Sequence, residues 1–197
     1  TYYLSNEFPR LASSVSIPQK TMHMLRVISD SVQHADRIVR ELHDFASPRK
    51  PLHKKTNINT LVEETLSRVE APENVKIITE LGNLPPIRAD KDMVKRVFVN
   101  LAENAIQAME KGGRLKVSTK KTEESVEVGF KDTGTGISKD NMKKLFTPFF
   151  TTKAQGMGMG LAICKKLIES HGGRIKAESE EGKGTTFTVE LPIQQEN

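Results

Sequence analysis

The chain has 197 residues and a formal net charge of +5, and 36% of its residues are hydrophobic and 28% charged. This composition is typical of one globular domain with a smaller element attached. No run of eighteen apolar residues occurs and the first ten residues lack the pattern of a signal peptide, so the sequence predicts no membrane contact. The single cysteine, Cys164, fits a reducing compartment, and we expect a cytoplasmic location.

The positive charge is spread along the chain, and its densest cluster lies at residues 49–55. This cluster also contains a proline and holds Arg49, Lys50, His53, Lys54 and Lys55. A basic linker explains such a segment more simply than a nucleic-acid patch. We therefore predict a linker over residues 48–56 and no nucleic-acid partner.

Residues 21–46 are predicted to form one helix. Its apolar side chains recur at alternating intervals of three and four residues, which is the heptad spacing of helices that pack on other helices: Leu25, Ile28, Val32, Ala35, Val39, Leu42 and Ala46. A single helix cannot bury such a stripe, so it needs a partner within the chain or a second copy of the chain. Residues 1–7 are interpreted as the end of a preceding helix, and residues 8–19 as a loop.

Beyond residue 56 the sequence predicts a mixture of helices and strands. Helices are predicted over residues 59–69, 90–110 and 159–170, and strands over residues 75–81, 113–121, 125–132, 173–180 and 184–192. Asp90 suits the N-cap of the second of these helices, and Gly112 suits its end. Strands joined by hairpins and faced by helices indicate an α+β fold, a two-layer α/β sandwich.

The helix predicted over residues 90–110 has an unusual polar ridge. Asn100, Glu103, Asn104 and Gln107 follow the i, i+3, i+4, i+7 spacing of one helix face. On this helix alone, a solvated face is the simpler interpretation. Exposed faces favour Lys and Glu over paired Asn, however, and these oxygens would also suit a hydrated Mg²⁺ that is shared with phosphates.

Two glycine clusters lie about twenty residues apart. Asp132 ends a predicted strand and enters a turn that contains Gly134 and Gly136, where a carboxylate can accept a hydrogen bond from an exocyclic amine such as that of adenine. Alone, this pattern is weak, because ordinary turns share it. The second cluster, residues 156–160, precedes a helix and offers free N–H groups to phosphates, although it is neither a P-loop nor a dinucleotide fingerprint.

Taken together, these segments resemble the ATP-binding catalytic domain of sensor histidine kinases, within the GHKL superfamily of kinases and ATPases. Four motifs stand in family order: NLAENAIQA at residues 100–108, DTGTGI at 132–137, FTPFFTTK at 146–153 and GMGMGLAI at 156–163. They are similar to the N-box, G1 box, F-box and G2 box of that family. The resemblance covers residues 57–193 and is specific, because four ordered motifs coincide.

The resemblance also implies roles for single residues. Asn104 would be the Mg²⁺ ligand, and Asp132 would accept a hydrogen bond from the adenine amine, with Thr186 reaching the base through a water. The segment between the glycine clusters would close over ATP as a lid. The residues expected to bind ATP are Asn100, Glu103, Asn104, Gln107, Ala108, Asp132, Gly134, Gly136, Ile137, Phe149, Thr151, Thr152, Lys153, Gly156, Gly158, Met159, Gly160, Leu161 and Thr186.

One departure within the family pattern separates two mechanisms. Members that hydrolyse ATP carry a Glu four residues before the Mg²⁺ ligand, as the base that activates water, and this sequence has Asn100 there. An amide cannot take a proton from water at neutral pH, so phosphoryl transfer is favoured over hydrolysis. Glu103 points about 100° away along the helix and stays open as a weaker candidate for a base.

The resemblance further implies that residues 1–47 are part of a dimerisation and phosphoacceptor hairpin. The family's acceptor motif is absent, so the acceptor histidine is expected upstream of this chain. His34 and His43 are interpreted as surface or packing histidines.

The expected function is therefore transfer of the γ-phosphoryl of MgATP to that upstream histidine, and then to the receiver domain of a response regulator. The chain would form a homodimer through residues 21–46. A conformational ATPase and a non-catalytic nucleotide-binding dimerisation module stay as alternatives.

Overall fold

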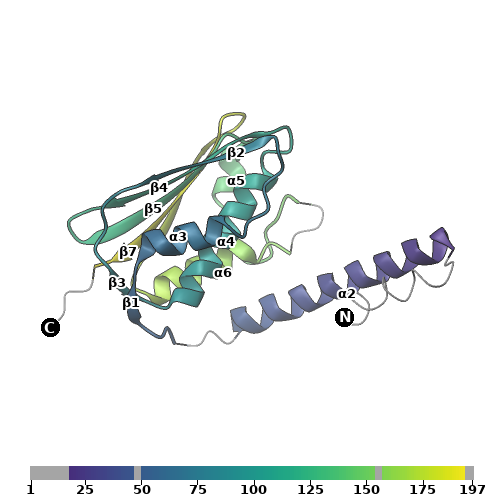
Figure 1. The fold of residues 1–197 in the computed structure, drawn as a ribbon, viewed down its shortest axis with the longest axis horizontal. Helices are drawn as coiled ribbons and strands as arrows, with labels where there is room; N and C mark the ends of the chain where they lie inside the picture. Colours follow the sequence, from purple (N-terminus) through teal and green to yellow (C-terminus); the bar gives the residue numbers. More distant parts are fainter. Residues whose placement is uncertain (1–17, 47–49, 154–156, 194–197) are drawn as a thin grey trace. The chain divides into compact units, whose positions relative to one another are not determined.

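The computed structural model describes residues 18–46, 50–153 and 157–193. The chain divides into two compact units, residues 1–47 and residues 48–197. Figure 1 shows a long helix in the described part of the first unit, and a sheet with helices on one face in the second unit.

The first unit contains helix α2, Gln19–Ala46. It confirms the helix predicted over residues 21–46. Apolar side chains of the heptad stripe are largely exposed within the single chain: Ile28 51%, Val32 46%, Val39 64% and Leu42 42%. Such a stripe stabilises a helix only when another helix covers it. Among the described helices, none is long and apolar enough to span a membrane.

The second unit is built on a five-stranded mixed sheet with the strand order β2-β4-β5-β7-β6. The strands are β2 Val75–Leu81, β4 Gly113–Lys121, β5 Ser125–Asp132, β6 Arg174–Glu180 and β7 Gly184–Pro192. β2 and β4 are parallel, and the other neighbours are antiparallel. The bounds of β2, β4, β5 and β7 are those predicted from the sequence. In β4, β5 and β7 the prediction follows from alternating apolar and polar residues.

Three helices cover one face of this sheet: α3 Ile58–Leu66, α4 Lys91–Gln107 and α6 Gly160–Ser170 (Figure 1). α4 lies at the centre and contacts both other helices as well as β5. Its apolar side, including Val97, Phe98 and Leu101, is fully buried, and the rings of Phe98 and Phe130 lie 5.6 Å apart. The prediction of a two-layer α/β sandwich is confirmed.

The structure adds short elements that the sequence patterns did not predict. β1 (Lys54–Thr56) pairs antiparallel with β3 (Ile87–Ala89) in a separate two-stranded sheet. The expected linker over residues 48–56 therefore ends in a strand of the second unit. A one-turn helix, α5 (Lys139–Met142), follows the N-cap Ser138. Three or four residues are too short for a period to be recognised.

Asp90 joins several of these elements. As predicted, it is the N-cap of α4, and its Oδ1 accepts hydrogen bonds from the N–H groups of Asp92 and Met93. Its Oδ2 accepts from the N–H of Leu52 at 2.9 Å, and its own N–H donates to Nε2 of buried His171 at 3.0 Å. The start of the second unit is thereby fixed to one end of α4 and to the end of α6.

His171 must be neutral in this arrangement, because its Nε2 accepts a hydrogen bond. Its Nδ1 lies 2.7 Å from the carbonyl oxygen of Leu167, to which Nδ1–H donates. Burial lowers the pKa of His171 below its ordinary value of 6.5, and nearby His53 lowers it further, while Leu167 and Asp90 act in the opposite direction. The unfolded chain consequently binds a proton at a pH where the folded chain does not.

We expect the free energy of unfolding to fall as the pH drops below about 6.5, by up to about 1.4 kcal/mol per pH unit, since protons then favour the unfolded chain. Urea denaturation of the wild type and of His171→Gln, between about pH 7.5 and about pH 5.5, measures this dependence. The variant should lose most of the slope. The same substitution at exposed His23 is the matched control and should keep it; an unchanged slope in His171→Gln would contradict the assignment.

Candidate functional site

The polar ridge of α4 makes a connected set of contacts. The side-chain N–H of Asn104 donates to Oδ1 of Asn100 at 2.9 Å. Nζ of Lys153 donates to Oδ1 of Asn104 and to Oε1 of Gln107, both at 2.6 Å. A cation from the segment after residue 145 is thus held by two neutral amide oxygens of the helix. The ridge is therefore contacted by a lysine from another segment and is not merely a solvated face.

This arrangement bears on which metal ion the ridge could hold. Surrounding protein lowers the pKa of Lys153, and the negative charge of Glu103 partly offsets that effect. Among the described residues, no cluster of three or more His, Cys, Asp or Glu side chains suits a metal ion. Amide oxygens that hold an ammonium group do suit a Mg²⁺ that takes its other ligands from phosphates and water. The residues of the ridge fit the expected ion.

Asp132 forms a second polar centre, at the end of β5. The residue is buried, with 2% of its surface exposed, and its Oδ1 accepts hydrogen bonds from the N–H groups of Gly134 at 2.8 Å and Thr185 at 3.1 Å. Burial raises the pKa of Asp132, and these N–H groups oppose the rise. The two backbone N–H groups thus fix the orientation of the carboxylate.

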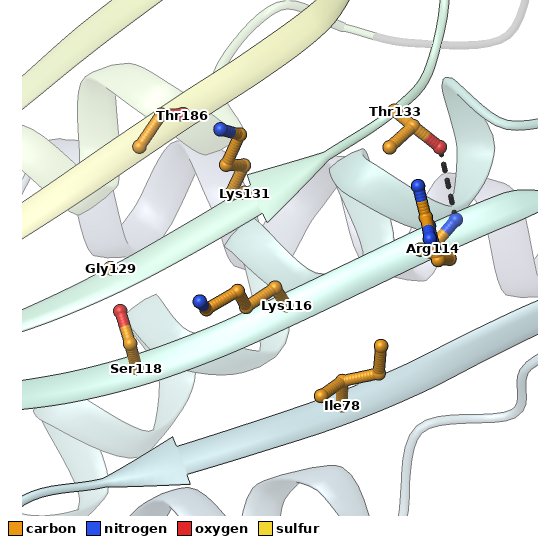
Figure 2. Close-up of a pocket in the computed structure, with 8 residues that line it drawn as sticks. All are labelled: Ile78, Arg114, Lys116, Ser118, Gly129, Lys131, Thr133 and Thr186. Atoms are coloured by element: carbon orange, nitrogen blue, oxygen red, sulfur yellow. Dashed lines mark hydrogen bonds between the residues drawn. The ribbon is translucent and has the colours of Figure 1, made fainter.

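Thr186 does not lie at this centre. In the register of β5 and β7, Thr186 is opposite Lys131, and Figure 2 shows both residues lining a cavity with Gly129, Lys116 and others. Successive side chains of a strand point to opposite faces of the sheet. Thr185 is therefore the threonine on the Asp132 face, whereas Thr186, the residue expected from the sequence, lies on the opposite face.

Thr185 and Ser179 are the polar residues near Asp132 that sequence reasoning missed. Their hydroxyls lie 2.9 Å apart, and the hydroxyl of Ser179 also accepts the N–H of Ile137 at 2.8 Å. Both follow from strand alternation once the register of β6, β7 and β5 is known. The sequence offered only the weaker signal of two consecutive threonines.

The glycines of the first cluster allow close backbone approach to two neighbours. A Cβ on Gly134 would lie 2.5 Å from the carbonyl oxygen of Ala108, and one on Gly136 would lie 2.2 Å from that of Glu180. Gly136 also has a φ of +68°, which disfavours any side chain. The N–H of Thr135 donates to Ala108 at 3.1 Å. The turn after Asp132 is therefore fixed on the end of α4.

The second glycine cluster contacts α4 about two turns before Ala108, at Asn100. A Cβ on Gly160, the first residue of α6, would lie 2.5 Å from the side-chain nitrogen of Asn100. Gly158 has a φ of +69° and lies against the backbone of Phe150. Met159 between them is fully buried, so it supports the loop from below. The first turn of α6, whose N–H groups have no partner within the helix, consequently lies beside the polar ridge.

Three positions spaced four residues apart along α4 therefore contact three different segments. Asn100 contacts Gly160, Asn104 contacts Lys153, and Ala108 contacts Gly134. Four residues correspond to about one helical turn, so the three contacts follow one line of about 12 Å along α4. The predicted N-box, F-box and both glycine clusters are brought together on this line.

Other predicted residues lie around this line or outside the described chain. Phe149 is 62% exposed and has a φ of +65°, and Thr151 and Thr152 are exposed beside Lys153. Glu103 is exposed on α4, and Leu161 is partly buried in the first turn of α6. Gly156 and the side chains of His34 and His43 lie outside what the structure describes.

Comparisons with known proteins show the family to which the chain is similar. Residues 89–195 match the family described as histidine kinase-, DNA gyrase B- and HSP90-like ATPase. The sensor histidine kinase ZraS of Escherichia coli (strain K12) is 37% identical over 174 residues, which is 86% of this chain. The matched region is 37% of the length of ZraS, so the chain spans well under half of this curated relative.

Two solved structures are also similar. The catalytic domain of histidine kinase ThkA superposes with a TM-score of 0.65 and 35% identity, over 72% of this chain and 95% of that domain. ThkA in complex with response regulator protein TrrA superposes with a TM-score of 0.75 and 27% identity, over 98% of this chain and 57% of that one. The likeness thus extends over both units of the chain.

Asp132→Asn is expected to weaken ATP binding by about tenfold to a hundredfold, because a hydrogen bond to a charged acceptor is worth about 1.5–3 kcal/mol. Isothermal titration with ATP measures the change. The matched control is Thr186→Val, which alters the opposite face of the sheet and should keep the wild-type affinity. Equal affinities of Asp132→Asn and the wild type for ATP would contradict the expected hydrogen bond between adenine and Asp132.

Proposed function

Because the chain belongs to the family of histidine kinase-, DNA gyrase B- and HSP90-like ATPases, we propose that it is the catalytic part of a sensor histidine kinase. In this proposal it binds MgATP along α4 and donates the γ-phosphoryl group to a histidine upstream of the chain. The observation that carries the proposal is the line of contacts along α4, where neutral amides, a lysine and a free helix N-terminus come together.

The adenine is placed at the Asp132 end of this line. Oδ1 of Asp132 is engaged by two backbone N–H groups. The carboxylate is thereby oriented to accept a hydrogen bond from the exocyclic amine of the base. The glycine turn at Gly134 and Gly136 leaves the backbone free to approach a flat ring closely. Thr185, which shares this face, replaces Thr186 as the threonine near the base.

The phosphates are placed at the Asn100 end. The first turn of α6 has N–H groups without helical partners and a partial positive charge, which favour phosphate oxygens. Asn104 would hold Mg²⁺ through the amide oxygen that Lys153 occupies in this structure. When bound, Mg²⁺ neutralises phosphate charge as the phosphoryl group moves. Lys153 would then turn from the amides to a phosphate oxygen.

The amide of Asn100 is the reason for proposing transfer rather than hydrolysis. An amide is not basic enough to take a proton from water. In addition, Oδ1 of Asn100 already accepts a hydrogen bond from the side chain of Asn104. Catalysis by this unit then rests on positioning and charge neutralisation. Glu103 is the carboxylate whose charge acts on Lys153, and it is the residue that a hydrolytic ATPase, the alternative function, would have to use.

The exposed apolar stripe of α2 supports a homodimer as the second part of the proposal. Two copies of α2, each with its preceding helix, would bury the stripe in a four-helix bundle that presents the acceptor histidine. ThkA, which this chain resembles over both units, was solved with a response regulator. We therefore include the receiver domain of a response regulator as the next acceptor of the phosphoryl group.

Asn104→Ala is expected to weaken binding of MgATP by about tenfold or more while changing the affinity for metal-free ATP much less, because it removes a metal ligand. Lys153→Met is the comparison variant, since losing a cation should weaken both forms by similar factors. Titrations with and without Mg²⁺ give the ratio of the two affinities. If the ratio of the affinities with and without Mg²⁺ were the same in Asn104→Ala as in the wild type, Asn104 would not be a Mg²⁺ ligand.

The kinase reaction is tested with γ-labelled ATP, Mg²⁺ and a separate hairpin protein that carries the upstream helix with its histidine. We expect label on the hairpin protein that is labile in acid and stable in base, as phosphohistidine is. A hairpin with that histidine replaced by Gln is the matched control and should take up none. Label released only as free phosphate would instead assign a hydrolytic ATPase, with Glu103 to be tested next.

A further inference from the structure

The face of the five-stranded sheet opposite the helices carries a hollow of its own. Figure 2 shows this cavity over the middle strands, and its volume is about 430 Å³. It is lined by Ile78, Arg114, Lys116, Ser118, Gly129, Lys131, Thr133 and Thr186. In the described part of the second unit, α3, α4 and α6 cover only the other face. The cavity therefore shares β5 and β7 with the nucleotide site but faces away from it.

Like charges lie directly opposite one another around this cavity. The strand register pairs Lys76 with Arg114 and Lys116 with Lys131. Such pairs destabilise a sheet, whereas opposite charges in the same positions stabilise it. At the other end of the same face, Lys120 forms an ion pair with Glu127 at 2.8 Å. Glu127 and Glu190 are also opposite each other on this face, but each forms an ion pair with a lysine. The four cations near the cavity are less completely paired.

Few carboxylates neutralise this block. Glu80 forms an ion pair with Lys116 at 2.7 Å, and Glu178 lies opposite Thr186 at the rim, on the edge strand β6. Arg114 and Lys131 form no ion pair with any of the described residues. Two cations beside the cavity consequently keep their charge available to a ligand.

The floor of the cavity is open because β5 has a glycine at its centre. Gly129 lies opposite Ser118, and a Cβ on Gly129 would lie 3.0 Å from the hydroxyl oxygen of Ser118. Ser118, Thr186 and the apolar Ile78 are among the residues that line the cavity. A glycine in a strand interior weakens the strand and often marks a close approach by a ligand.

We propose that this cavity binds a small phosphorylated molecule with two or more phosphate groups. Its volume is in the range of about 300–1,000 Å³ that is typical of small-ligand sites. The lining cations Arg114, Lys116 and Lys131 lie close together on β4 and β5, which favours a compact anion over an acidic protein or a nucleic acid. Arg114 and Lys131 bind phosphate oxygens through charge-assisted hydrogen bonds, and Ser118 and Thr186 add hydroxyl donors.

Inorganic pyrophosphate is the first probe, titrated into the whole chain without Mg²⁺ and followed by backbone amide NMR. We expect the largest shifts at Ser118, Gly129 and Thr186. Pyrophosphate at the nucleotide site would instead shift Gly158 and Gly160, so failure of this proposal is distinguishable from failure of the proposed kinase function. Shifts confined to Gly158 and Gly160, or spread evenly over the surface, overturn the proposal.

Lys131→Met tests the role of charge, and Lys120→Met on the same face is its matched control. Lys131→Met is expected to weaken pyrophosphate binding by about tenfold or more. It should also raise the melting temperature at low salt, because it removes the repulsion with Lys116. Lys120→Met should leave pyrophosphate affinity unchanged and gain no stability, because it breaks an ion pair.

Two outcomes of this comparison contradict the proposal. One is equal pyrophosphate affinity in Lys131→Met and Lys120→Met. The other is tighter binding of a hexaglutamate peptide than of pyrophosphate, which would assign the face to an acidic protein partner.

Discussion

Helix α4 packs into the core with one side and carries the proposed ligand-binding ridge on the other. The architecture of the second unit depends on both sides of this helix. Val97 and Leu101 are fully buried against the sheet and the neighbouring helices. Because that side is fixed by packing, the opposite ridge cannot rotate, and Asn100, Asn104 and Ala108 stay aligned with their three loop partners. Rigid support of this kind places binding groups more accurately than a loop can.

The two faces of the sheet offer different chemistry at the same positions along the chain. Asp132 and Thr185 face the helices and are buried, whereas Lys131 and Thr186 face the outer cavity. Adjacent residues of β5 thus belong to two sites, one proposed for adenine and one for a phosphorylated molecule.

The sequence predicts the long elements well and the site only in part. β4 and β5 match their predicted bounds because alternation over eight or nine residues is unambiguous, whereas β1 and β3 have three residues each. The sequence pattern led to Thr186, whereas Thr185 shares the face of Asp132, because the facing of a strand residue depends on the register and a shift of one residue reverses it. The contact of Lys153 with Asn104 joins residues 49 positions apart, and no local pattern reports it.

The central claim is that a nucleotide lies along the helix side of the sheet, between Asp132 and the start of α6. Backbone amide NMR with the non-hydrolysable analogue AMPPNP and Mg²⁺ tests it most directly. The account predicts large shifts at Gly134, Thr185 and Gly160 together with the side-chain amide of Asn104, and none at Gly129. Shifts at Gly129 and Thr186 with an unchanged Asn104 amide would place the nucleotide on the wrong face and contradict it.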